Sequence, residues 1–126
     1  MSTKQVIVLR KDLNMRKGKM VAQGAHASCN VIIDMENKIQ LWDTHSKEEP
    51  YRKWKNEQFT KICVSVNSEQ ELLDLYNKAK DSGMLCSLIQ DAGHTEFNGV
   101  PTYTSCAIGP DDSDVIDAIT KHLPLL

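Results

Sequence analysis

A cation, an amide and an imidazole recur at helical spacing near the amino terminus. Lys19, Gln23, His26 and the further amide Asn30 lie four, three and four residues apart, so a helix would carry all four side chains on one stripe. Such a row suits a helix that lines a cleft. A lysine in the first turn would also add its charge to the helix dipole, and together they would hold a phosphate or a developing oxyanion. The simpler alternatives are a surface lysine and a histidine that only packs.

A second polar group follows an apolar run later in the chain. It is the stretch Asp91-Ala-Gly-His-Thr-Glu-Phe-Asn-Gly-Val-Pro-Thr-Tyr-Thr104, which is rich in carboxylates, hydroxyls and glycines. In open α/β sheets, ligand grooves lie beyond the carboxyl ends of the strands. We therefore expect Asp91 to lie near the start of the first helix. The alternative is an Asx turn that only begins a loop.

Several catalytic signatures are absent from the sequence. There is no G-x-S-x-G, P-loop, G-x-G-x-x-G or H-E-x-x-H motif, and the histidines lack metal-ligand spacing. No serine or cysteine has the surroundings of an activated nucleophile. The sequence therefore predicts that any hydrolysis uses an activated water, without a metal or another cofactor.

Charge is distributed unevenly along a chain whose net charge is −2. In the first 27 residues, six cations face only one carboxylate, Asp12; the cations are Lys4, Arg10, Lys11, Arg16, Lys17 and Lys19. Because this cluster adjoins the polar helix, it predicts a local phosphate-binding patch. The alternative is a solvated basic loop.

Length and composition favour one globular domain, residues 1–126, with 40% hydrophobic and 25% charged residues. No apolar run is long enough to cross a membrane, and the first residues lack the apolar segment of a signal peptide. Four well-separated cysteines without a C-x-x-C motif predict reduced, buried thiols in a cytoplasmic protein.

Periodicity predicts an α/β fold with a mixed sheet. Expected strands cover residues 5–9, 59–66, 84–89 and 104–108, and expected helices follow at 18–35, from 69 until Gly83, and at 115–123. Ser68 begins a capping box, and residues 109–114 should end the last strand. Trp42, Tyr51 and Trp54 suggest a further short helical segment within 36–58, interrupted near Pro50. The first helix should pack through an apolar stripe formed by Val21, Ala22, Ala25, Cys29 and Ile32.

The motifs resemble those of the archaeal/eukaryotic-type (type II) peptidyl-tRNA hydrolases over nearly the whole chain. The resemblance rests on the following segments: Val8-Leu-Arg-Lys-Asp-Leu-Asn-Met15, Gly18-Lys-Met-Val-Ala-Gln-Gly-Ala-His-Ala27, Lys61-Ile-Cys-Val-Ser-Val66, Gln90-Asp-Ala-Gly-His-Thr95, Ala107-Ile-Gly-Pro110 and Ile119-Thr-Lys-His-Leu-Pro-Leu125. It implies a three-layer α/β/α domain with a four-stranded mixed sheet, often a homodimer. It also implies hydrolysis of the ester that joins a peptide, or an aminoacyl group, to the 3′ end of tRNA.

The resemblance also implies site residues, matched by position: Lys19, Gln23, Asp91, Thr95 and Thr104 as catalytic residues, with His26 beside the site. Lys19 would stabilise negative charge, Asp91 would orient or deprotonate water, the two threonines would position that water, and Gln23 would hold the ester or an amide of the substrate. Substrate and tRNA would be bound by Arg10, Lys11, Arg16, Lys17, His26 and His94.

Departures from the family pattern keep other interpretations open. His94 and Glu96 stand where relatives commonly carry arginine and glutamine. One alternative is a non-catalytic RNA- or protein-binding module that retains the fold, and another is a small-molecule hydrolase, which would need no basic patch.

Overall fold

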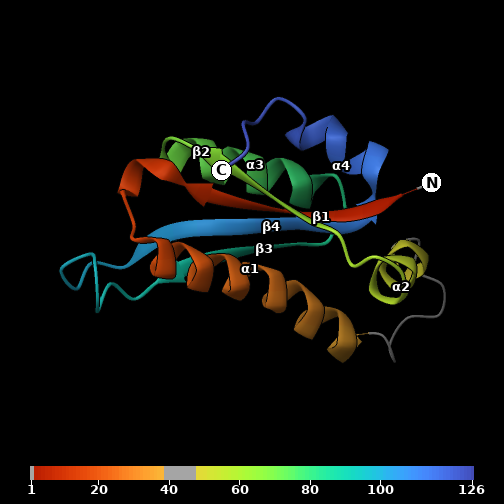
Figure 1. The fold of residues 1–126 in the computed structure, drawn as a ribbon, viewed down its shortest axis with the longest axis horizontal. Coiled ribbons are helices and arrows are strands. Elements are labelled where there is room, and N and C mark those ends of the chain that lie inside the picture. Colours follow the sequence, from red (N-terminus) through yellow and green to blue (C-terminus); the bar gives the residue numbers. More distant parts are fainter. Residues whose placement is uncertain (1, 39–47) are drawn as a thin grey trace.

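A four-stranded mixed sheet forms the centre of the molecule (Figure 1). The computed structural model describes residues 2–38 and 48–126. The strands are β1 (Thr3–Arg10), β2 (Lys61–Val66), β3 (Cys86–Asp91) and β4 (Thr102–Asp112), in the order β2-β1-β4-β3. Strands β1 and β2 are parallel, whereas β4 is antiparallel to both β1 and β3. The predicted mixed sheet is therefore confirmed, including its antiparallel pair β3–β4.

Helices cover both faces of the sheet and complete three layers. They are α1 (Lys17–Lys38), α2 (Glu48–Asn56), α3 (Glu69–Asp81) and α4 (Ser113–Thr120), with a 3-10 turn η1 (Lys11–Leu13) after β1. Helices α1 and α2 lie on one face, and α3 and α4 lie on the other (Figure 1). The predicted α/β/α class is confirmed. In the described ranges, no helix combines the length and apolar character that crossing a membrane requires.

Strand β1 explains why its sequence is a continuous apolar run. Val6 and Val8 belong to the core beneath α3 and α4, while Ile7 and Leu9 pack against residues on the α1 side. A strand that is covered on both faces needs apolar side chains at every position. Because Ile7 and Leu9 pack with Met15 and Met20, the carboxyl end of β1 lies beside the start of α1.

Strand β4 is longer than predicted. Residues 109–114 were expected to end it, but the strand continues through Gly109 and Pro110 to Asp112 and pairs with Thr3 and Lys4. A register shift between Lys4 and Val6 accommodates this extension, as a bulge does. The last helix consequently begins at Ser113, two residues earlier than expected, and ends at Thr120.

The expected interruption of the second helical segment near Pro50 is wrong. Pro50 is in the first turn of α2, where its missing N–H would have no helical partner in any case. Tyr51 and Trp54 are buried as expected, whereas Trp42 lies outside the described residues. Strand β2 begins later than predicted, because Phe59 has a φ of 57° and its N–H donates to the Trp54 carbonyl.

The expected ends of α3 are confirmed. The Ser68 hydroxyl accepts a hydrogen bond from the Glu71 N–H at 3.0 Å, and Gly83 follows the last turn with a φ of 77°. The Glu71 carboxylate accepts a hydrogen bond from the Asn67 N–H at 3.4 Å. In a capping box it would accept from the N–H of the N-cap residue, Ser68. Both signals are local, so the sequence alone suffices to predict them.

All four cysteines are unpaired, but only one of them is buried. Cys106 is fully enclosed, Cys86 is partly covered, and Cys29 and Cys63 are exposed. The prediction of buried thiols is therefore wrong for Cys29 and Cys63. Cys29 lies on the outer side of α1, and Cys63 lies on the edge strand β2, where the α1 layer does not cover it.

The packing face of α1 also differs from the predicted apolar stripe. Val21, Ala22, Ala25 and Cys29 are exposed, and Ile32 is only half-buried. The helix instead packs through the face that carries Gln23, Gly24, Ala27, Ser28, Val31 and Met35. A Cβ at Gly24 would lie 3.4 Å from Ile7, so glycine permits close contact with the sheet. The polar members of this face find partners in the sheet, as described below.

Candidate functional site

The polar helix stripe and the polar loop meet at one end of the sheet. Asp91 is the last residue of β3, and Lys19 is in the first turn of α1. The turn after β1, the start of α1 and the loop of residues 92–101 gather at the same end of the molecule (Figure 1). This position, beyond the carboxyl ends of β1 and β3, is where open α/β sheets form ligand sites.

Lys19 joins the helix to the loop through its ammonium group. Its Nζ donates to Asp91 Oδ1 at 2.9 Å and to Thr95 Oγ1 at 2.9 Å. The Lys19 and Asp91 side chains are only 14% and 15% exposed, so water screens this ion pair weakly. The same ammonium lies 5.7 Å from the centroid of the Phe97 ring, which shields it from one side. The predicted association of Lys19, Asp91 and Thr95 in space is thus observed.

Gln23 and Thr104 extend this network into the interior. Gln23 Nε2 donates to Asp91 Oδ1 at 3.2 Å, and the Thr104 hydroxyl donates to Gln23 Oε1. Because Thr104 occupies the carbonyl oxygen, the amide nitrogen of Gln23 is directed at the carboxylate. Thr104 is fully buried on β4, and its hydroxyl holds the Gln23 amide in this orientation. Thr95 is exposed, unlike Thr104.

The charge state of Asp91 follows from its partners. The hydrogen bond from Lys19 holds the pKa of the Asp91 carboxyl below its usual range, although partial burial opposes the shift. The Gly93 N–H, the charge of Lys19 and the Gln23 amide act in the same direction. At neutral pH, Asp91 is therefore a carboxylate whose oxygens are strongly engaged, and such a group binds a proton weakly.

Backbone geometry holds the loop after Asp91 in place. The Gly93 N–H donates to Asp91 Oδ2 at 2.9 Å, so the Asx turn considered as an alternative is present together with the ion pair. Gly93 has a φ of 86°, and a Cβ there would lie 2.3 Å from the Val100 carbonyl oxygen. The Gly99 N–H closes the loop by donating to the Gly93 carbonyl at 2.8 Å. Only glycine fits position 93.

A left-handed backbone costs an L-residue about 1–2 kcal/mol. We expect Gly93→Ala to reduce the free energy of unfolding by more than this, because the new Cβ also clashes with Val100. Gly99→Ala is the matched control: Gly99 has a φ of 78°, but a Cβ there would meet nothing within 4 Å. Chemical denaturation of both variants provides the measurement. Equal losses of unfolding free energy would show that the contact with Val100 does not matter.

Three buried serines attach α1 to the sheet. Ser105 donates to the Gln23 carbonyl at 3.0 Å, Ser87 donates to the Ala27 carbonyl at 2.7 Å, and Ser28 donates to Gln5 Oε1 at 2.6 Å. Buried hydroxyls and carbonyls require such partners. These contacts fix the register of α1 over β3 and β4 and hence the place of Lys19 and Gln23. Sequence reasoning did not identify them; the available signal was the occurrence of Gln5, Ser87 and Ser105 within otherwise apolar strands.

The predicted phosphate-binding cations divide into two groups. Arg10 is only 9% exposed, and its guanidinium contacts Asp12 at 2.7 Å and the Tyr103 carbonyl at 3.0 Å, so it stabilises the turn after β1. The others are exposed: Lys11 begins η1, and Arg16 and Lys17 lie at the amino end of α1. Arg16 lies 3.7 Å from Glu96, a contact that links the helix start to the loop.

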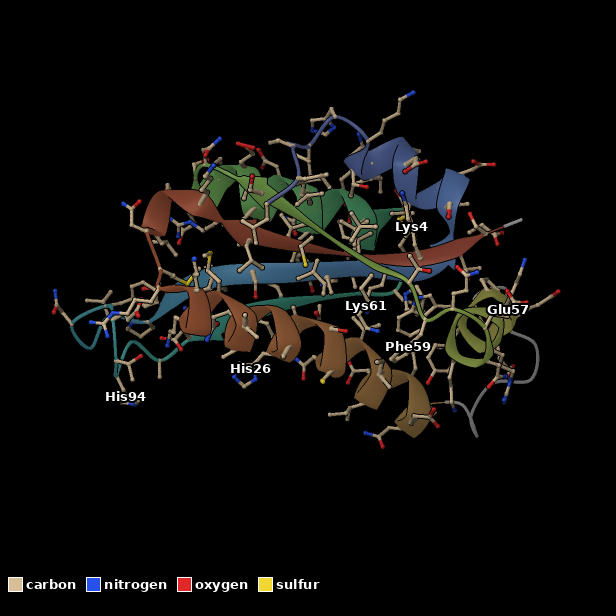
Figure 2. The ribbon with its side chains drawn as sticks, viewed as in Figure 1. Lys4, His26, Glu57, Phe59, Lys61 and His94 are labelled. Carbon is tan, nitrogen blue, oxygen red and sulfur yellow. The ribbon has the colours of Figure 1, made fainter. Side chains whose placement is uncertain are left out.

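The two candidate histidines are exposed on the same side of the molecule. His26 projects from the outer surface of α1, and His94 lies at the tip of the loop after β3 (Figure 2). His26 also lines a groove of about 320 Å³ that runs between α1 and β3 and contains Gln23 and Asp91. Both histidines are thus open to solvent, and their contact with a substrate stays a prediction of the sequence.

In residues 2–38 and 48–126, no three His, Cys, Asp or Glu side chains are grouped so that they could hold a metal ion. Hydrolysis without a metal stays a prediction of the sequence.

Comparison with known proteins adds independent information. Residues 3–126 match the sequence model of the family described as peptidyl-tRNA hydrolase PTH2. The chain is 47% identical over 123 residues to a peptidyl-tRNA hydrolase of Methanocaldococcus jannaschii, covering 98% of this chain and 99% of the relative. A peptidyl-tRNA hydrolase of Methanothermobacter thermautotrophicus is 43% identical with the same coverage. A probable peptidyl-tRNA hydrolase 2 of Dictyostelium discoideum is 41% identical, over 97% of this chain and 54% of the relative.

Proposed function

The chain belongs to the peptidyl-tRNA hydrolase PTH2 family, and we propose that it hydrolyses the ester between a peptide and the 3′-terminal ribose of tRNA. The oxygen of a water molecule attacks the ester carbonyl carbon, and the bond from that carbon to the ribose oxygen breaks. The ribose oxygen takes up a proton, so the products are a peptide carboxylate and a tRNA with a free hydroxyl. One observation carries the assignment of this reaction to the site: Lys19, Asp91 and Gln23 already form a single connected network.

In this proposal, Lys19 stabilises the oxyanion. An ammonium group has three N–H donors. Two of them are directed at Asp91 and Thr95, which leaves one for an oxygen of the substrate. The Lys19 ammonium is held at its place before the substrate arrives, so little reorganisation is needed when the carbonyl oxygen becomes negative.

Asp91 orients the attacking water by accepting one of its hydrogen bonds. The lowered pKa of Asp91 makes it a weak base, since an efficient general base has a pKa near the working pH. Of the two roles considered from the sequence, orientation is therefore the one that we propose. Gln23 shares Asp91 Oδ1 with Lys19, and its second N–H is available to the substrate.

The direct test uses tRNA that carries a labelled N-acetylaminoacyl group. We expect catalytic release of the labelled acid by the purified protein, together with intact tRNA. The minimal ester, an N-acetylaminoacyl adenosine, should be cleaved with a much lower kcat/KM, because it lacks the phosphates that the basic residues would contact. Binding of tRNA without any cleavage would support the non-catalytic module, and equal kcat/KM values for the two esters would support a small-molecule hydrolase.

We further propose that tRNA phosphates contact the exposed cations at the amino end of α1. Neutralising Arg16 and Lys17 together should remove about two phosphate contacts. The slope of log Kd against log salt concentration should then decrease by roughly 1.8. Lys121→Ala together with Lys80→Ala is the matched control, because both lysines are exposed but come from the end of α4 and from α3. Titrations of tRNA at several salt concentrations provide the measurement. An unchanged slope in the Arg16 and Lys17 variant would contradict this contact.

A second copy of the chain is the proposed partner of the exposed apolar stripe on α1. Beside this stripe lies an apolar groove of about 410 Å³ whose lining includes Ile7, Val21, Ala25 and Leu126. Val21 is 72% exposed and Leu126 is 47% exposed, and large exposed apolar patches mark interfaces. Val21→Asp should shift a dimer to monomer in sedimentation experiments, with Asn77→Asp on α3 as the control. A wild-type protein that is monomeric at all concentrations would contradict the homodimer.

Residues 1–126 are proposed to form one hydrolase domain that acts in the cytoplasm. The family match spans residues 3–126, and one sheet joins the first strand to the last. Peptidyl-tRNA is formed during translation, and free thiols are typical of a reducing compartment.

A further inference from the structure

The groove between α1 and β3 differs in chemistry from the basic end of the molecule. Its walls include His26 and Asn30 from α1 and Ile89 and Gln90 from β3, and none of its lining residues is a lysine or an arginine. The groove begins at Gln23 and Asp91 and continues towards the carboxyl end of α1, whereas Arg16 and Lys17 precede the site. The scissile ester would therefore have a cationic surface on one side and, on the other, an amide-rich groove without lysine or arginine, with the Asp91 carboxylate at its start.

Three of the groove side chains have unused hydrogen-bonding groups. Within residues 2–38 and 48–126, the side chains of His26, Asn30 and Gln90 have no hydrogen-bond partner. Each has both a donor and an acceptor, which is the combination that a peptide group requires. A phosphate backbone would need cations instead. The groove thus suits an uncharged chain of amides.

Backbone groups of β3 lie at the sheet edge, one residue before the part of the strand that lines this groove. Strand β3 is an edge strand, and the Gly109 N–H donates to the Leu85 carbonyl at 2.7 Å. In an antiparallel pair, alternate residues bond to the partner strand, so the N–H and C=O of Leu88 are directed away from β4. No described strand lies beyond this edge. Extended peptides bind to such edges through main-chain hydrogen bonds.

We propose that the groove between α1 and β3 is the peptide subsite of the enzyme, and that it binds the main chain of about three residues of the substrate's peptide. This inference rests on the proposed hydrolase function. Gln23 and Asn30 are seven residues apart on the helix, a distance of about 10 Å, which matches about three extended residues. Recognition of main-chain amides makes cleavage depend on the number of peptide groups in the substrate and not on particular side chains.

The experiment uses tRNA esterified with N-acetylated chains of one, two, three and five glycines. Glycine keeps the reacting ester constant and adds only main-chain amides. We expect kcat/KM to rise about fivefold for each added residue up to three, the factor that one net hydrogen bond provides, and then to level off. Asn30→Ala and Gln90→Ala should each reduce the ratio of kcat/KM for the three-glycine substrate to that for the one-glycine substrate. Asn77→Ala, an exposed asparagine on α3, should leave this ratio unchanged.

The outcomes separate the two levels of the proposal. A wild-type kcat/KM that is independent of chain length, or an Asn30→Ala variant that lowers kcat/KM for all four substrates by one factor, would overturn the peptide subsite but leave the hydrolase function. If none of the four substrates is cleaved, the hydrolase function is overturned, and the subsite with it. A rise that continues from three to five glycines would refute the three-residue length.

Discussion

Replacing Lys19 with alanine should lower kcat/KM for peptidyl-tRNA by at least about a hundredfold, which is the lower end of the losses measured for single oxyanion donors. The ammonium contributes the positive charge of the Asp91 and Thr95 network and the one N–H that remains for the substrate. Lys78→Ala is the matched control, because Lys78 is exposed on α3, on the opposite face of the sheet from α1. The measurement is single-turnover cleavage of N-acetylaminoacyl-tRNA.

The Lys19→Ala variant should still fold. The Lys19 ammonium contacts Asp91 and Thr95 at the end of the sheet, and α1 is attached to the sheet separately by the hydroxyls of Ser28, Ser87 and Ser105. Circular dichroism and thermal unfolding check this point. A folded variant that turns over at a near-normal rate would exclude Lys19 from the mechanism.

Asp91→Asn should also lower kcat/KM by about a hundredfold or more, since it keeps the size of the side chain but removes the charge that orients water and holds Lys19. Asp117→Asn is the matched control, because it removes the ion pair with Lys4 on the far face of the sheet. Hydrolysis by both variants is compared at neutral pH. A folded Asp91→Asn enzyme with wild-type kcat/KM would contradict a role for the carboxylate.

The pH profile of the wild-type enzyme tests the same residue. The pKa of Asp91 is lowered in the folded protein, so the active carboxylate form is present at neutral pH and is lost only as pH falls through a value below about 4. We therefore expect kcat/KM to show no acid limb from Asp91 between pH 5 and 8. An acid limb near pH 6 that disappears in Asp91→Asn would show that Asp91 acts with a raised pKa, as a general base.

The secondary structure of this chain was largely readable from local patterns. The cap at Ser68, the glycine at position 83 and the apolar run of β1 all depend on residues within one or two helical turns or one strand. The polar stripe of α1 depends on helical spacing in the same way, so Lys19, Gln23 and His26 could be selected as candidates from the sequence. Ends were harder to predict, because β4 continues as far as its partner β1 allows.

Which face of α1 is buried was decided by the tertiary structure. Hydrophobicity assigned the packing face of α1 to Val21 and Ala25, but both are exposed, and Gln23 and Ser28 are buried. These polar groups are stable inside because Thr104 and Gln5, from distant strands, complete their hydrogen bonds. The cost of burying a polar group depends on a partner that local periodicity does not reveal.

Dependence on distant partners also separates the site residues that could be selected from the sequence from the contacts that could not. Residue type and spacing determined that a cation, an amide and a carboxylate were available for hydrolysis at Lys19, Gln23 and Asp91. Only the folded chain decided that Thr104 donates to Gln23 and that Arg10 donates to the Tyr103 carbonyl. These roles depend on which groups meet across the sheet, because hydrogen-bond partners more than 60 residues apart in sequence become neighbours only when the chain folds.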